Sequence, residues 1–163
     1  MIASKRWLTS LLLVGGAVAL TVLGGCCTLG LRTCAPTDQL AFVGDTKMNS
    51  CSGDDYGYPV GVRLYYLSDK VAFESAELRD LWDDKDEDLD GSLLGTVTEL
   101  TIVPDSAVVP WSGQRPAGAT WLGIAANFCR LDADGWRQVV PLDDALRLRV
   151  MLKDVQLIVT TER

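Results

Sequence analysis

Five cysteines and 22 acidic residues stand out in this 163-residue sequence as side chains that could take part in chemistry, and no histidine accompanies them. Without histidine there can be no Ser-His-Asp or Cys-His catalysis, and the commonest metal ligand is missing. The carboxylate pairs Asp54-Asp55 and Asp143-Asp144 lie in turn-like contexts, which favours turns over a catalytic acid and base. No glycine-rich phosphate loop is present. We therefore expect a protein that is not an enzyme.

Cys26 directly follows the most apolar stretch of the sequence. Lys5 and Arg6 precede this stretch, which covers residues 7–25 and ends with Leu-Gly-Gly. A basic start, an apolar centre and small residues at the end are typical of a secretory signal peptide. Leu-Gly-Gly before a cysteine is also the pattern of a bacterial lipobox, in which the thiol receives a diacylglycerol. We expect residues 1–25 to be a lipoprotein signal peptide and Cys26 to carry the lipid.

Two other interpretations of the amino terminus stay open, a transmembrane anchor and a secreted protein without lipid. An uncleaved stretch of residues 7–25 could just span a bilayer, although its glycines and threonines weaken such a span. The residue after Cys26 is Cys27 and not aspartate, which favours the outer membrane by the usual sorting rule of Gram-negative lipoproteins. The expected location is therefore the outer membrane.

The other four cysteines could form disulfides. Cys27, Cys34, Cys51 and Cys129 are an even set, which in an oxidising periplasm is compatible with two disulfides. The sequence does not rank the three pairings, and buried or unpaired thiols stay open as an alternative. None of the four has zinc-finger spacing.

An acidic run follows residue 82 and resembles part of a calcium loop. Asp86, Asp88, Asp90 and Gly91 match positions 1, 3, 5 and 6 of such a loop. Position 12, where a bidentate glutamate is needed, is Val97. This favours a solvated acidic loop, with weak calcium binding as the alternative, and we expect no metal or other cofactor apart from the lipid on Cys26.

The charge of the chain excludes one class of partner. The full sequence carries −7, from 15 basic and 22 acidic residues. Loss of Lys5 and Arg6 with the signal peptide leaves 13 basic residues and a charge of −9. Such a domain lacks the basic face that phosphate contacts need, so we expect no nucleic acid partner. An anionic membrane would repel it, so the lipid must hold it there.

The pattern of apolar residues predicts mainly β structure after a tether. Residues 26–38 show no sustained period and predict a lipidated tether, while residues 39–163 predict one folded domain. Period-two alternation predicts about seven short strands, which favours an antiparallel β-sandwich. These strands lie around residues 40–45, 62–66, 99–102, 122–128, 136–142, 146–153 and 155–159. Between them, Leu78, Leu81 and Trp82 have helical spacing, and Ser75 could cap the start of that helix at one end or edge of the sandwich.

Several motifs, in order, resemble the type VI secretion lipoprotein family called TssJ, SciN or VasD. They cover nearly the whole mature domain: Val60-Gly61-Val62-Arg63-Leu64-Tyr65-Tyr66-Leu67, Phe73, Leu81-Trp82-Asp83-Asp84, Leu93-Leu94-Gly95, Glu99, Val103-Pro104, Leu122-Gly123-Ile124-Ala125-Ala126 and Trp136-Arg137. The resemblance implies a transthyretin-like β-sandwich with a short helical element added after the second strand. It also implies an anchor in the inner leaflet of the outer membrane, with the domain facing the periplasm. It also implies a structural adaptor that binds the periplasmic domain of a TssM-like inner-membrane protein, and through it a TssL-like protein, in a higher-order complex.

The same resemblance points to the loop between the first two strands as the partner-binding loop. Residues 47–59 are long for a hairpin connection, which is unusual unless the loop has a function. Two tyrosines could act as anchors and two aspartates could steer a basic partner. The expected contact residues are Lys47, Met48, Asn49, Asp54, Asp55, Tyr56 and Tyr58.

Two alternatives to this reading of the loop and the chain stay open. The loop could be only a tolerated surface connection. The protein could instead be a lipid-anchored periplasmic binding module for calcium or a small ligand. The extra cysteines are a departure from the family pattern, and Cys51 could join the loop to Cys129 or Cys34, which would rigidify it and lower the entropy cost of binding.

Overall fold

The computed structural model describes residues 35–51, 55–83, 89–131 and 133–162. Within these residues the chain forms eight strands, one short α-helix and one 3-10 helix, and the strands pair into two sheets. The elements are β1 (Thr37–Gly44), β2 (Val60–Leu67), α1 (Val71–Ser75), β3 (Thr98–Ile102), β4 (Val109–Gln114), β5 (Trp121–Ala126), η2 (Ala133–Trp136), β6 (Arg137–Pro141), β7 (Arg147–Lys153) and β8 (Gln156–Thr161).

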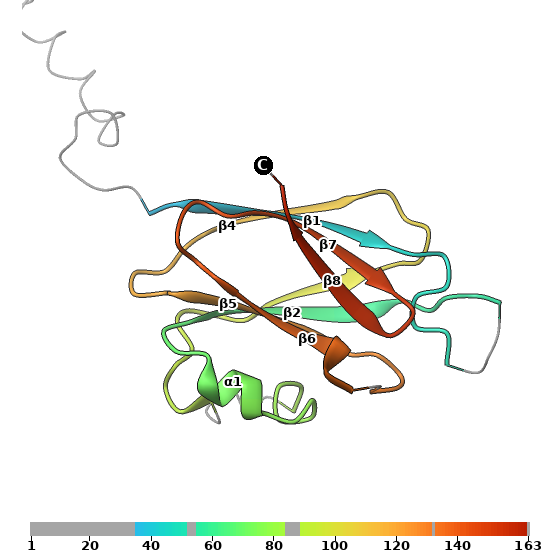
Figure 1. Cartoon of the computed structure of the whole chain (residues 1–163), viewed down its shortest axis with the longest axis horizontal. Helices are drawn as coiled ribbons and strands as arrows, with labels where there is room; N and C mark the ends of the chain where they lie inside the picture. Colours follow the sequence, from blue (N-terminus) through green and yellow to red (C-terminus); the bar gives the residue numbers. More distant parts are fainter. Residues whose placement is uncertain (1–34, 52–54, 84–88, 132, 163) are drawn as a thin grey trace, which may run out of the picture. The chain divides into compact units, whose positions relative to one another are not determined.

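The two sheets form the layers of a β-sandwich (Figure 1). Sheet I has the strand order β4-β1-β7-β8, and sheet II has the order β3-β2-β5-β6. Every neighbouring pair is antiparallel except β1 and β7, which are parallel. The expected antiparallel sandwich is therefore confirmed, with one parallel pair at the centre of sheet I.

The core lies between the sheets, where the period-two pattern predicted it. Leu40 and Phe42 of β1 face Val62 and Leu64 of β2 across this layer, and all are buried. Their neighbours in sequence, such as Gln39, point outward. Alternation thus sorts each strand into an inner and an outer row, because successive side chains of a strand point to opposite faces.

The strand pattern differs from the expectation at two places. Strand β4 was not predicted, because Pro110 and Gly113 weaken a strand signal, and it pairs with β1 at the edge of sheet I. Strand β1 begins at Thr37, so Asp38 lies inside the domain and not in the tether.

A short helix after the second strand is confirmed, but it is α1 and ends at Ser75, so the helix predicted to start at Ser75 and include Leu78, Leu81 and Trp82 was wrong. Helix α1 ends at Ser75, whose Oγ donates to the carbonyl oxygen of Val71 at 2.7 Å, and Ala76 is already extended with φ −64° and ψ 143°. Asp80 then accepts a hydrogen bond from the backbone N–H of Glu77 at 2.8 Å, which supports a turn. Local side-chain bonds to the backbone therefore replace a helix here.

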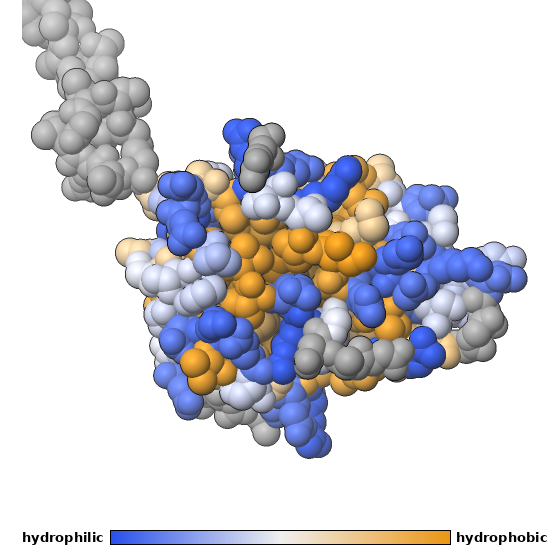
Figure 2. All heavy atoms as spheres, viewed as in Figure 1, coloured by the Kyte–Doolittle hydropathy of each residue, from blue (hydrophilic) through white to orange (hydrophobic). Residues whose placement is uncertain are grey.

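Helix α1 packs against the outer face of sheet II and not at an end of the sandwich. Phe73 is fully buried, and its ring lies 5.2 Å from the ring of Tyr65 on β2. Gly123 on β5 leaves room for this ring, since a Cβ there would approach it to 2.9 Å. The outer face of sheet II is thus covered. On the face shown in Figure 2, apolar surface stays exposed in the middle, where β8 crosses the front.

Candidate partner-binding surface

Asn49 fixes the first part of the connection between β1 and β2, residues 45–51. This residue is 6% exposed and has a positive φ of 58°, which asparagine tolerates better than most residues. Its side-chain oxygen accepts from the backbone N–H of Cys129 at 2.7 Å, and its amide nitrogen donates to the carbonyl oxygen of Pro59 at 3.3 Å. Its own backbone N–H donates to the carbonyl oxygen of Asp154 at 2.5 Å. This one residue thus connects the loop to three other segments, two through its side chain and one through its backbone.

A disulfide between Cys51 and Cys129 joins the loop to the segment after β5. It is one of the pairings that the sequence left open, and it lies next to the bonds that Asn49 makes. The loop is therefore fixed to a neighbouring strand connection by a covalent bond as well as by hydrogen bonds.

The predicted contact residues divide into buried and exposed ones. Met48 is fully buried, and Asn49 is nearly so, which contradicts a direct partner contact by these two side chains. Tyr56 is 77% exposed and Tyr58 is 43% exposed. Lys47 is also exposed, and its Nζ lies 3.2 Å from an oxygen of the exposed Asp55.

The connection between β3 and β4 adds apolar residues at the end of the sandwich where the loop after β1 lies, because Val109 pairs with Phe42 near the end of β1. The backbone N–H of Asp105, between β3 and β4, donates to the carbonyl oxygen of Gly44 just before the loop. Val103 and Val108 in that connection are 48% and 46% exposed. These two residues and the two loop tyrosines are four of the seven large apolar side chains that are exposed among the described residues. We call this surface the loop end.

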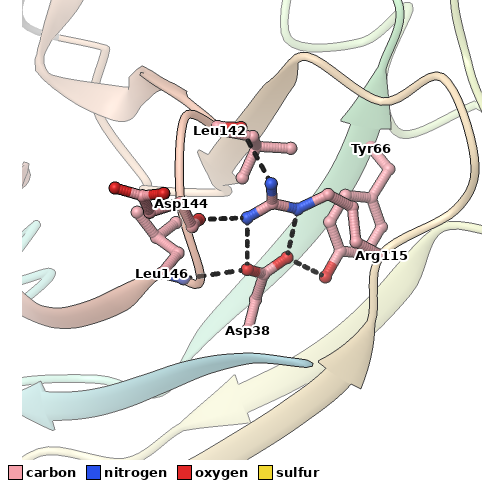
Figure 3. Close-up of polar contacts among 6 residues, drawn as sticks. All are labelled: Asp38, Tyr66, Arg115, Leu142, Asp144 and Leu146. Atoms are coloured by element: carbon pink, nitrogen blue, oxygen red, sulfur yellow. Dashed lines mark hydrogen bonds and ion pairs between the residues drawn. The ribbon is translucent and has the colours of Figure 1, made fainter. Parts of the chain in front are cut away.

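The opposite end of β1 contains a buried ion pair (Figure 3). Asp38 is fully buried, and its two oxygens lie 2.7 and 3.2 Å from the Nη2 and Nε atoms of Arg115. The same carboxylate accepts from the hydroxyl of Tyr66 at 2.9 Å and from the backbone N–H of Leu146 at 3.0 Å. Arg115 also donates to the carbonyl oxygens of Leu142 and Asp144, at 2.8 and 2.5 Å. Every charged group in this cluster is thereby paired.

The environment of the cluster changes the acidity of two of its members. Burial, followed by the hydrogen bond to Asp38, raises the pKa of the Tyr66 hydroxyl well above its ordinary value. The hydrogen bond to the same carboxylate raises the pKa of the Arg115 guanidinium, although burial acts against this shift. Both shifts favour the protonated form, so the cluster keeps one geometry over a wide range of pH. This points to a structural role.

Several predicted site residues lie outside the described residues. They are Cys26, Cys27, Cys34, Asp54, Asp86 and Asp88. Asp90, the remaining calcium candidate, is exposed. Among the described residues, no group of three His, Cys, Asp or Glu side chains is arranged to hold a metal ion. In the same part of the chain, no helix has the length and apolar character needed to cross a membrane.

Solved structures of type VI secretion proteins share this fold. Lip of Serratia marcescens, described as a membrane bound component of the type VI secretion system, has a TM-score of 0.71 and 21% identity, over 79% of this chain and 99% of that one. The lipoprotein TssJ1 of Pseudomonas aeruginosa also has a TM-score of 0.71, with 22% identity, over 79% of this chain and 98% of that one.

A third similar chain comes from a structure described as the T6SS protein TssM C-terminal domain (869-1107) from EAEC. Its TM-score is 0.64 and its identity 23%, over 76% of this chain and 99% of that one. No curated protein matches the sequence. The family model described as Type VI secretion lipoprotein, VasD, EvfM, TssJ matches residues 36–160. This match spans the whole sandwich, and the chain therefore belongs to the type VI secretion lipoprotein family.

Proposed function

We propose that this chain is an outer-membrane-anchored adaptor of the type VI secretion membrane complex. A lipid on Cys26 holds it in the inner leaflet, and its loop end binds the periplasmic domain of a TssM-like inner-membrane protein. Through that protein it connects to a TssL-like protein. Its work is to hold other components in place, without turnover of a substrate.

The observation that carries the proposal is the loop end itself. Tyr56 and Tyr58 are exposed on a loop whose backbone is fixed by Asn49 and by the Cys51–Cys129 disulfide. Exposed aromatic side chains on a rigid support suit protein recognition, because little conformational entropy is lost when they are buried by a partner. A clustered set of exposed apolar residues is also uncommon on a protein surface without a binding role.

The position of the loop end supports anchoring from the other side. Strand β1 begins where the tether enters the domain and ends where the loop starts, after eight residues. At about 3.3 Å per residue, the two ends of this strand are roughly 25 Å apart. The loop end therefore lies at the end of the sandwich opposite the residue where β1 begins.

The comparison with the EAEC structure is consistent with a TssM-like partner. The matched chain is covered almost fully by 76% of this chain, so it is much shorter than the 869-1107 segment in the description. This is what we expect if a chain of this fold accompanies that TssM segment.

The proposal is tested by isothermal titration of the purified mature protein with the periplasmic domain of its cognate TssM-like protein. Tyr56→Ala should weaken binding by about 2 kcal/mol, roughly 30-fold, because an anchor residue of this kind carries much of an interface. Val71→Ala is the matched control, since Val71 is 64% exposed but lies on α1. Absence of binding by the wild-type protein at micromolar concentration would exclude the adaptor function.

Anchoring is tested separately by metabolic labelling with radioactive palmitate. Cys26→Ser should abolish the label, whereas Cys27→Ser should retain it, because only the first of these residues follows the Leu-Gly-Gly pattern. Label that persists in Cys26→Ser would contradict the assigned lipid site.

A further inference from the structure

Strand β8 is the least protected edge of the two sheets. Edges are normally protected by proline or by charged residues, because their unpaired backbone groups can pair with another chain. Among the four edge strands, β4 contains Pro110, β6 contains Pro141 and β3 contains Glu99. The β8 sequence, Gln-Leu-Ile-Val-Thr-Thr, contains neither kind of residue.

The backbone of β8 has hydrogen-bonding groups that point away from β7. The N–H of Glu162 donates to the carbonyl oxygen of Arg147, which fixes the alternation of bonded and non-bonded pairs along this ladder. In this alternation Leu157, Val159 and Thr161 turn their N–H and C=O groups outward. Within the described residues no hydrogen bond to another segment takes up these groups.

Apolar surface adjoins this open edge. Ile158 is 41% exposed on the outer face, and Val159 is only partly buried on the inner side. Strand β6 of the other sheet touches β8, and its Val140, which pairs with the buried Leu122, is also partly buried on the inner face. Figure 2 shows this apolar surface in the middle of the face. The side chains of an added strand that point to the inner face would cover Val159 and Val140.

The outer face of sheet I is basic in a domain that is acidic as a whole. Arg147, Arg149 and Lys153 of β7 all point outward and are exposed. The outward positions of the four described strands of this sheet include no acidic residue. Glu162, just after β8, lies 3.8 Å from Arg149. Arg149 pairs in register with Thr160, whose short side chain leaves the guanidinium room to extend toward the edge.

We propose that β8 accepts an extended segment of another protein as a fifth strand of sheet I. The segment has apolar side chains at alternate positions, which point to the inner face over Val159 and Val140. The acidic side chains between them lie on the outer face, toward the arginines of β7. Backbone pairing supplies affinity in this mode, and the alternate side chains supply specificity. These strands do not belong to the loop end, so the inference is independent of the proposed function.

The test uses the purified mature protein and a fluorescent peptide, Val-Glu-Val-Glu-Val-Glu-Val, with anisotropy as the readout. We expect the peptide to bind about tenfold more tightly than two controls. One control has the same residues with the glutamates grouped at one end, and the other has lysine in place of glutamate. Equal binding of all three peptides, or none by the first, would overturn the proposal.

Two variants identify the edge and the charge. Val159→Pro removes an outward N–H while every bond to β7 remains, and it should weaken binding about tenfold. Val139→Pro makes the same change on β6 and should leave binding unchanged. Arg149→Gln, which keeps the backbone intact, should weaken binding of the acidic peptide and reduce the salt dependence of that binding.

If sedimentation instead shows a dimer that Val159→Pro dissociates, and the peptide does not bind, the occupant is a second copy and the proposal is wrong.

Discussion

At the scale of single residues, Asp38 is the side chain that fixes the amino-terminal end of β1. It accepts hydrogen bonds from Arg115, Tyr66 and Leu146, which come from three different parts of the chain. A buried ion pair of this kind gains little over an apolar pair, but loss of one partner leaves the other charge buried and uncompensated. The cluster therefore fixes one position of β1 in the sheet, and its net contribution to the free energy of unfolding is small.

Asp38→Asn is expected to lower the free energy of unfolding by about 3 kcal/mol, because Arg115 keeps its charge without a counterion. Urea denaturation of the purified protein measures this. Asp143→Asn is the control, since Asp143 is exposed and should change stability by less than about 0.5 kcal/mol. A similar small effect of both substitutions would show that the ion pair does not hold β1.

The raised pKa of Tyr66 predicts how the free energy of unfolding changes at alkaline pH. Its pKa is raised in the folded protein, so above about pH 10 the unfolded chain loses the phenolic proton first. The unfolded state then binds fewer protons than the folded state, and stability falls as pH rises. At neutral pH both states keep the proton, and this dependence is absent.

Unfolding of the wild type and of Tyr66→Phe should therefore be compared from about pH 8 to about pH 11. The wild type should lose up to roughly 1.4 kcal/mol more per pH unit above pH 10 than the variant does. The other tyrosines and the lysines are common to both proteins and cancel in the difference. Parallel curves would contradict the assigned protonation of Tyr66.

Part of the Asp38 cluster could be predicted from the sequence. Asp38 has the same parity as Leu40 and Phe42, so an extended β1 places its carboxylate on the inner face, where it needs a partner. Its partner Arg115 lies 77 residues further along the chain, and no local pattern connects the two. The burial of Met48 and Asn49 likewise depends on the contacts of Gly44 and Cys129, which only the folded chain brings together.

At the scale of elements, strands were easier to predict than the helical segment. Two-residue alternation in β2 and β7 reports directly which face is buried, whatever the neighbours are. The spacing of Leu78, Leu81 and Trp82 reports burial as well, and Leu81 is indeed buried, but turns achieve it without a helix. Periodicity thus predicted which side chains are buried. The backbone conformation was set by local hydrogen bonds, one donated by the Ser75 hydroxyl and one accepted by the Asp80 carboxylate.

The packing of α1 against sheet II gives a prediction at the scale of elements. Gly123→Ala should destabilise the protein by about 1–3 kcal/mol, because the new methyl group would lie 2.9 Å from the Phe73 ring and push α1 away from sheet II. Gly61→Ala is the matched control on the same outer face, where the closest atom of Trp82 is at 3.6 Å. Thermal unfolding followed by circular dichroism measures both. Equal melting temperatures for the two variants would contradict close packing of α1.

At the scale of the whole molecule, the Cys51–Cys129 disulfide links two connections that are 78 residues apart in the sequence. It joins the loop after β1 of sheet I to the connection after β5 of sheet II, so it ties the two layers together at the loop end. Closing a segment of this length reduces the entropy of the unfolded chain by an amount worth roughly 4 kcal/mol in the chain-entropy account. Its effect should therefore reach the global stability and not only the loop.

The double variant Cys51→Ala with Cys129→Ala should lose about 2–4 kcal/mol of unfolding free energy in urea under oxidising conditions. Lys47→Ala is the control, because it removes only a surface ion pair at the same end and should cost less than about 1 kcal/mol. A loss in the double variant as small as that of the control would mean that Asn49 and its hydrogen bonds hold the loop end alone. A larger loss would show that the layers depend on the covalent link, and partner binding through Tyr56 should then weaken in the same variant, because the loop would have to be ordered on binding.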